Sequence, residues 1–141
     1  MGIRAPKIDR SFNGVVLGES RDSDSDINYP VFCLKYIHNS YNLDLCSKCD
    51  QSFSKGFLRK LHRISQLTWT DIQFGDRKKN GSEKIARQSI RIPIPNSITN
   101  DVKDFLSFYF NSDRGRIIGY RSKGNVFNIV FVDTKLEVYK H

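Results

Sequence analysis

The pattern of apolar and polar positions first changes near residue 30. Residues 1–30 hold one short apolar run, GVVLG, which is followed by the polar segment ESRDSDSDIN at 19–28. This segment has no periodicity and is rich in Asp and Ser, which is typical of an exposed loop. The next segment, YPVFCLKYI, alternates, with Val31, Cys33, Lys35 and Ile37 on one side, and this alternation predicts a strand.

Residues 52–75 follow a helical period. An apolar residue recurs every three or four positions, in a stripe made of Phe57, Leu58, Leu61, Ile64 and Leu67. Ser52 or Ser54 would cap this helix at its N-terminus. A second, short helix is expected to begin near Thr68 or Thr70, to bury Trp69 and Ile72, and to end at Gly75.

From about residue 87 the apolar residues recur at every second position, as they do in strands. The segment ARQSIRIPIP alternates, but Pro93 and Pro95 restrict it to the edge of a sheet. Gly124 in SKGN favours a tight hairpin turn, and VFNIVFV is apolar on both faces, which predicts a central strand. After ARQSIRIPIP we therefore expect four successive strands: FLSFYF, GRIIGYR, NVFNIVFVD and LEVYK.

Together these elements predict a single α+β domain over residues 1–141. Helices would be followed by a C-terminal antiparallel meander, with an additional N-terminal strand or hairpin. Residues 1–50 would form an N-terminal extension that carries the acidic loop 19–28, and residues 53–141 would hold the helix pair and the sheet. No run approaches 18 consecutive apolar residues, and the first ten residues lack the apolar region of a secretory signal. We therefore expect a cytoplasmic protein with no membrane partner.

Charge is distributed unevenly along the chain. Residues 1–50 carry 6 Lys/Arg and 7 Asp/Glu, whereas residues 51–141 carry 17 and 8, so the net charge of +8 belongs to the C-terminal two thirds. Such a field favours a polyanion, and nucleic acid is the commonest polyanion in a cell. The alternative is that the positive charge serves solubility alone. The residues expected to bind nucleic acid are Arg59, Lys60, Arg63, Arg77, Lys78, Lys79 and Lys123.

One group of residues has the composition of a zinc site. The segment CSKC at 46–49 has the spacing of a zinc knuckle, and Cys33 with His38 would complete a tetrahedral set with Cys46 and Cys49. Zinc ribbons pair two such knuckles, however, and Cys33 fits equally well as a buried strand residue. We therefore expect ordinary thiols in a reducing compartment, with no metal and no cofactor.

Common enzyme motifs are missing from the sequence. It contains no P-loop, no GxGxxG, no GxSxG and no HExxH. Acidic residues after residue 50 are scattered, and no pair is placed like the carboxylates of a two-metal nuclease. If this protein cleaves nucleic acid, we expect it to do so without a metal.

The last 27 residues carry side chains that a core-forming hairpin does not need. Arg116 and Arg121 flank one predicted strand, and alternation on the last predicted strand places Tyr139 and His141 outward. Metal-independent RNA cleavage requires cations that hold the scissile phosphate and a group that moves the proton of the 2′-OH. The candidate catalytic residues are therefore Arg116, Arg121, Tyr139 and His141. The alternative is that Tyr139 and His141 are solvated ends of edge strands.

A helix pair, a basic loop and a meander containing GRIIGYR, NVFNIVFVD and LEVYKH resemble the RelE/ParE superfamily of bacterial toxins over residues 53–141. The resemblance implies that Arg116 or Arg121 binds phosphate and that Tyr139 with His141 forms the terminal catalytic group. It also implies an endoribonuclease toxin that acts on mRNA, free or on the ribosome, and a cognate antitoxin as partner. Residues 1–50 have no counterpart in the family.

Two other classes of function stay open. One is a non-catalytic nucleic-acid-binding protein of phage, mobile-element or defence origin, for which the basic helix and loop would matter and the terminal Tyr and His would not. The other is a structural or protein-interaction domain whose positive charge is incidental. A steep salt dependence of RNA binding would separate the first class from the second.

Overall fold

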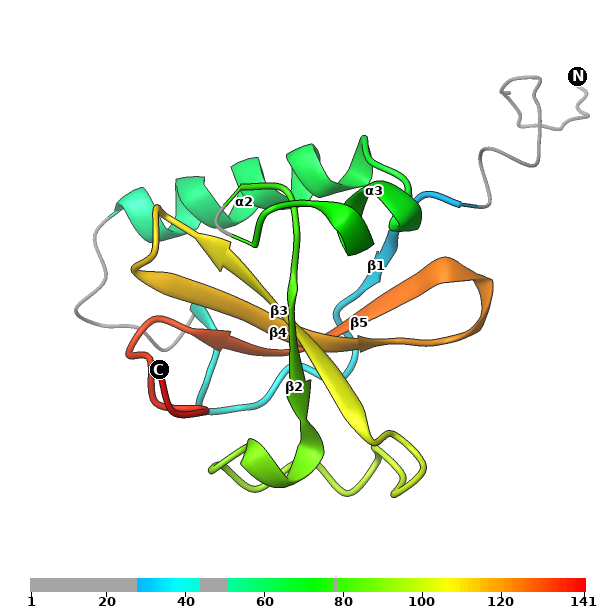
Figure 1. Ribbon diagram of the computed structural model, residues 1–141. Helices are drawn as coiled ribbons and strands as arrows, with labels where there is room; N and C mark the ends of the chain where they lie inside the picture. The colour runs from blue at the N-terminus through cyan, green and yellow to red at the C-terminus, as the bar shows by residue number, and fades with distance from the viewer. Residues whose placement is uncertain (1–27, 44–50, 78) are drawn as a thin grey trace, which may run out of the picture.

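The computed structural model describes residues 28–43, 51–77 and 79–141, which build a five-stranded sheet and two α-helices (Figure 1). The strand order is β1-β5-β4-β3-β2; β1 runs parallel to β5, and the other neighbours are antiparallel. The elements are β1 (Val31–Cys33), α2 (Gln51–Ser65), α3 (Trp69–Phe74), β2 (Glu83–Ala86), β3 (Asp104–Phe110), β4 (Gly115–Arg121) and β5 (Val126–Asp133), with 3-10 turns η2 (Arg87–Ser89) and η3 (Lys123–Asn125).

The predicted α+β class is confirmed, and so is the short second helix. Thr68 begins α3 with a capping box: its hydroxyl accepts from the N–H of Asp71 at 3.1 Å, and the Asp71 carboxylate accepts from the N–H of Thr68 at 3.1 Å. Gly75 ends the helix, and Trp69 and Ile72 are buried, as their spacing predicts.

Two details of the longer helix differ from the prediction. Ser52 and Ser54 lie inside α2 and do not cap it, because the helix already begins at Gln51. Leu58 is 66% exposed, and Phe53 takes its expected place in the core. The apolar stripe thus begins one turn earlier than predicted and runs through Phe53 and Phe57.

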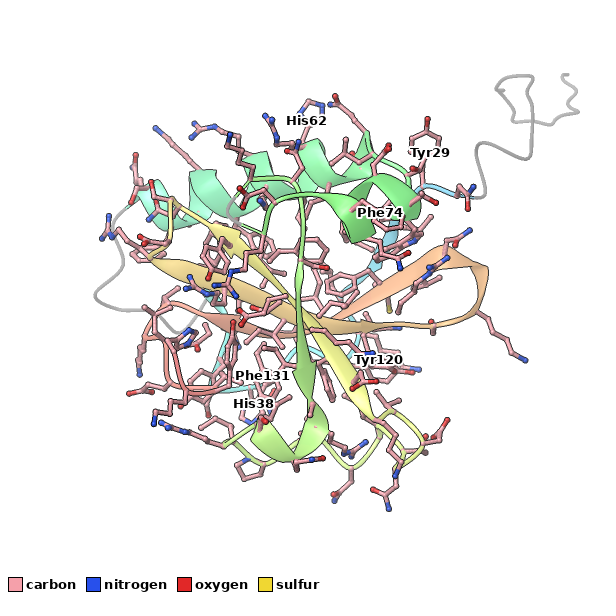
Figure 2. All side chains as sticks on the ribbon, in the orientation of Figure 1. Tyr29, His38, His62, Phe74, Tyr120 and Phe131 are labelled. Atoms are coloured by element: carbon pink, nitrogen blue, oxygen red, sulfur yellow. The ribbon has the colours of Figure 1, made fainter. Side chains whose placement is uncertain are left out.

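The sheet is covered on both faces, but by different kinds of structure. Helices α2 and α3 lie over one face, here called the helix face (Figure 1). The other face, here called the loop face, is covered by segments without regular structure around residues 34–43, 90–102 and 134–141. Figure 2 shows His38 and Phe131 on the loop face and His62 on the outer side of α2. Each face of the sheet has its own hydrophobic core. Phe108 and Phe127 are fully buried under the helices, and Phe105 and Phe131 are fully buried on the loop face.

The strands after the helices are confirmed only in part. The predicted strands FLSFYF, GRIIGYR and NVFNIVFVD are β3, β4 and β5, and β5 is internal, between β1 and β4. The predicted strand YPVFCLKYI is shortened to β1. The expected strand at 87–95 is wrong, because the strand in this region is β2, which ends at Ala86. After β2 the chain turns away from the sheet. The Arg87 guanidinium holds this turn by donating to the carbonyl oxygens of Thr99 at 2.6 Å, Val102 at 3.0 Å and Ile98 at 3.2 Å.

The expected last strand, LEVYK, is also wrong. The side chain of the fully buried Asp133 accepts from the N–H groups of Lys135 at 3.1 Å and Val138 at 2.9 Å, which turns the chain away from the sheet edge. Residues 134–141, here called the C-terminal hook, have no strand and lie against the loop face. The position beside β5 is taken by β1, from the other end of the described chain.

The pairing of β4 with β5 has no room for a side chain at Gly119. A β-bulge lies between Ile118 and Gly119, and a Cβ at Gly119 would come within 2.0 Å of the Asn128 carbonyl oxygen. We expect Gly119→Ala to lower the free energy of unfolding by about 3 kcal/mol or more, because backbone must move in the centre of the sheet. Urea unfolding followed by Trp69 fluorescence measures it.

The matched control is Gly124→Ala in the β4–β5 hairpin. A Cβ there meets nothing within 4 Å, and only the φ of 74° opposes alanine, so we expect a loss of roughly 1 kcal/mol. Equal losses in the two variants would contradict the steric role of Gly119.

Candidate nucleic-acid interface

Arg116 is a buried cation, with 5% of its surface exposed. Its guanidinium lies 3.6 Å above the ring of Tyr109, its register partner on β3. Its Nη1 donates to the carbonyl oxygens of Asp113 at 2.8 Å and Gly115 at 3.0 Å, whereas its buried Nε has no hydrogen-bond partner among the described residues. A buried donor without a partner is costly, so Arg116 marks this region as a candidate site.

The C-terminal hook brings Tyr139 to the same region. The Tyr139 hydroxyl donates to Oε1 of Glu83 at 3.1 Å, and the Ser107 hydroxyl lies 2.8 Å away, where it can donate to the Tyr139 oxygen. Burial raises the pKa of Tyr139 to about 12, and the Glu83 carboxylate acts in the same direction. The expectation that Tyr139 faces outward is therefore wrong, because a hook and not a strand sets its direction. A phenol with this pKa is not a proton acceptor at neutral pH.

His141 is the exposed member of this group. The centroid of its ring lies 4.3 Å from that of the Tyr139 ring. The charges of Arg116, Asp133 and Glu83 act on the protonated form of this imidazole. Burial and then the positive charge of Arg116 lower the pKa of His141. A lowered pKa keeps the imidazole neutral at physiological pH, so it can accept a proton. The structure thus brings together Arg116, Tyr139 and His141 with Ser107 and Glu83, here called the Arg116 cluster.

Arg121, the fourth candidate catalytic residue, does not belong to the cluster. It lies at the other end of β4 and on the helix face, where its guanidinium is 4.7 Å from the ring of Trp69 and donates to the side chain of Asn125. Lys123 is exposed beside it in η3. Neither cation is placed to share one phosphate with Arg116, because a seven-residue strand separates the two ends of β4 by roughly 20 Å.

The cations predicted on the first helix converge on a pocket. A pocket of about 310 Å³ opens between α2 and the turn that follows β3. The Arg63 Nε donates to Oδ1 of Asn80 at 2.6 Å, and the Lys60 ammonium donates to the carbonyl of Lys79. Burial, and after it the charge of Arg63, lowers the pKa of Lys60. The residues that line this basic pocket are Gly56, Arg59, Lys60, Arg63, Tyr109, Phe110, Asn111 and Ser112.

Tyr109 connects the basic pocket with the Arg116 cluster. It lines the pocket and carries the Arg116 guanidinium on its ring. Tyr109, Ser107 and Glu83 are not among the site residues predicted from the sequence. The signal for two of them is the strand FLSFYF, where Ser107 and Tyr109 are the polar-tipped residues on one side of an otherwise apolar segment.

The basic loop contributes less than expected. Arg77 pairs with Oε2 of Glu83 at 3.5 Å, so its charge is partly offset. Lys79 is exposed, and its carbonyl accepts the bond from Lys60. Lys78 lies outside the described residues.

The zinc hypothesis falls mostly on residues whose structure is not described, since Cys46 and Cys49 lie outside the described ranges. Cys33 is a half-buried free thiol. His38 accepts the N–H of Ser40 at its Nδ1 at 3.0 Å and stacks on Phe131 with ring centroids 5.4 Å apart (Figure 2). In the part of the chain that the structure describes, no three His, Cys, Asp or Glu side chains gather as metal ligands. Most of the predicted acidic loop 19–28 also lies outside the described residues.

Within the described ranges, no helix is both long enough and apolar enough to cross a membrane. Comparison with known proteins finds no matching family model, no matching curated protein and no matching solved structure. The resemblance to the RelE/ParE superfamily therefore stays a prediction.

The raised pKa of Tyr139 predicts a loss of stability at alkaline pH. The folded state holds the phenol proton more tightly than the unfolded chain, whose tyrosine titrates near pH ~10. This stabilisation is complete below pH ~10 and is lost as the pH rises toward about 12. Between these limits, the free energy of unfolding measured with urea should fall less steeply with pH for Tyr139→Phe than for wild type. At neutral pH the variant should be about 1–2 kcal/mol less stable. Tyr29→Phe is the control, and an unchanged pH slope in Tyr139→Phe would contradict the buried phenol.

Proposed function

We propose that this protein binds RNA and that the phosphate backbone of the bound RNA lies across the basic pocket and the Arg116 cluster. The observation that carries the proposal is the continuity of these two sites through Tyr109, which lines the pocket of Arg59, Lys60 and Arg63 and also carries the Arg116 guanidinium on its ring. A single small anion would neutralise one such cation group. A chain of phosphates matches successive groups along a surface.

The cations of the basic pocket take no part in the ion pairs Arg77–Glu83 and Lys84–Asp104. The Arg116 cluster, by contrast, contains the Glu83 carboxylate and lies opposite Asp133. In the basic pocket, Lys60 and Arg63 donate to neutral oxygens of the loop after α3, which fixes their side chains and leaves their charges uncompensated. Fixed, uncompensated cations favour phosphate because little side-chain entropy is lost when it binds.

Cleavage of the bound RNA is a second candidate function, and the position of His141 favours it. The neutral imidazole would accept the proton of a 2′-OH while its oxygen attacks the adjacent phosphorus. The bond from phosphorus to the 5′ oxygen then breaks, and the leaving oxygen takes up a proton from water while the His141 imidazolium returns its proton to the solvent, which gives a 2′,3′-cyclic phosphate and a 5′-OH. Arg116 would stabilise the charge of the phosphorane, and Tyr139 would position the His141 ring. Such an activity would be that of the endoribonuclease toxins that the sequence resembles, acting on mRNA.

RNA binding at the basic pocket predicts that the affinity depends on salt, and that removing a cation of this pocket weakens that dependence. Fluorescence anisotropy of a labelled oligoribonucleotide should give a falling line of log K against log salt for wild type. Arg59→Gln and Arg63→Gln should each flatten this slope by about 0.7, the value for one phosphate contact on a single strand. Lys103→Gln, which removes an exposed charge near the end of β2 and β3, should leave the slope unchanged. An equal effect of all three substitutions would show that net charge alone drives binding.

Cleavage predicts a rate that depends on His141 and not on a metal. In EDTA, His141→Gln should cut RNA about 10²–10⁴-fold more slowly than wild type, with unchanged affinity. The wild-type rate should fall with acid only below pH ~6.5, since protonation of the low-pKa imidazole removes the base. Lys140→Gln is the matched control. Cleavage by His141→Gln at the wild-type rate would remove His141 from the reaction, and binding without cleavage by wild type would leave the binding function alone.

A further inference from the structure

A separate pocket lies on the helix face at the end of β4 that is far from Arg116. It has a volume of about 320 Å³, which is at the small end of ligand pockets. Its walls combine apolar side chains with polar ones at the rim. The residues that line it are Trp69, Ile72, Gln73, Ser82, Lys84, Leu106 and Arg121.

The guanidinium of Arg121 is exposed at this pocket and is held in place by two neighbouring residues. The guanidinium carbon lies 4.7 Å from the centroid of the Trp69 ring, and Asn125 contacts both partners. The Asn125 side chain accepts from Arg121, and its carbonyl oxygen accepts from the indole N–H of Trp69 at 3.1 Å. Since Arg121 is exposed and lines the pocket, its remaining face is available to a ligand. This is the opposite of Arg116, whose guanidinium is buried.

The lining defines the chemistry of that ligand. A planar guanidinium backed by an indole attracts a flat aromatic ring, through stacking and cation–π contact. The half-buried Leu106 offers apolar contact for the ring, and Gln73 and Ser82 offer hydrogen bonds to its polar edge. Lys84 adds positive charge at the rim, partly offset by Asp104 at 3.5 Å. A nucleobase attached to a phosphate backbone combines these properties.

The loop between α3 and β2 joins this pocket to the basic pocket. Lys60 and Arg63 of the basic pocket donate to Lys79 and Asn80 of the loop, and Ser82, two residues later, lines the pocket with Arg121. A strand of RNA whose phosphates lie in the basic pocket can therefore pass along this loop to the second pocket.

We propose that the Trp69–Arg121 pocket receives one unstacked base of the bound RNA, so that Arg121 stacks on a base and does not hold the scissile phosphate. The proposal rests on the RNA-binding function argued above. It makes single-stranded RNA the substrate class, because a base can enter such a pocket only when it is free of its duplex partner.

The sole tryptophan of the chain, Trp69, reports on this pocket. The experiment titrates the full chain with a single-stranded oligoribonucleotide and with an abasic ribose-phosphate oligomer of equal length and charge, by anisotropy and by Trp69 fluorescence. We expect the base-bearing strand to bind roughly 5- to 100-fold more tightly and to be alone in changing the Trp69 emission, because one stacked base contributes that factor.

Substitutions separate stacking from charge. Arg121→Ala and Arg121→Lys should both abolish the preference for the base-bearing strand, since lysine keeps the charge but not the plane. Lys123→Ala, the neighbouring exposed cation, should keep the preference. A full preference in Arg121→Lys, or equal binding of both oligomers by wild type, would overturn the base pocket while RNA binding stands. If wild type binds neither oligomer, the proposed function fails as well.

Discussion

The site near the C-terminus depends on one buried carboxylate. Asp133 ends β5 and accepts the N–H groups of Lys135 and Val138, so that the chain leaves the sheet and folds back over the loop face. The N–H of Arg91 then donates to the Val138 carbonyl oxygen at 2.7 Å, which holds the hook against the preceding loops. Because Asp133 fixes the direction of the hook, it also fixes the positions of Tyr139 and His141 next to Arg116. Polar atoms inside a protein have few alternative partners, so this arrangement has little freedom to change.

The same sheet serves two different surfaces. On the helix face, α2 presents fixed cations, and the end of β4 presents Arg121 on its aromatic support. On the loop face, the hook brings the phenol of Tyr139 and the imidazole of His141 to the region of Arg116, where the Ser107 hydroxyl of β3 also lies. Tyr109 lies at the boundary, where it lines the basic pocket and stacks with Arg116. A polyanion that crosses this boundary would contact both surfaces at once, which relates the proposed binding to the proposed cleavage.

The two arginines of β4 illustrate how burial changes the chemistry of one side chain. Arg116 is enclosed, its guanidinium lies over Tyr109, and one of its donors lacks a partner within the described structure. Arg121 is exposed and already has an aromatic and an amide partner, so an anion would gain less there and a flat ring would gain more. The strand GRIIGYR therefore places its two arginines, which look like a symmetric pair in the sequence, in two different environments.

By itself the sequence determined the α+β class, the two helices, strands β3 to β5 and the basic character of the surface. Those features depend on the local spacing of apolar residues, on a helix cap such as Thr68 and on the number of charged residues. Each of these can be read from residues that are close together in the sequence. Only the tertiary structure decided that β1 pairs with β5, that residues 87–95 and 134–141 are not strands, and that Tyr139 is buried. The guanidinium of Arg87 and the carboxylate of Asp133 override the alternating pattern there, because hydrogen bonds to backbone groups turn the chain where its apolar residues alone would extend it. Likewise, only folding could separate Arg121 from Arg116 and join Tyr109 to the cations of α2, since contacts between residues far apart in the sequence leave no local signal.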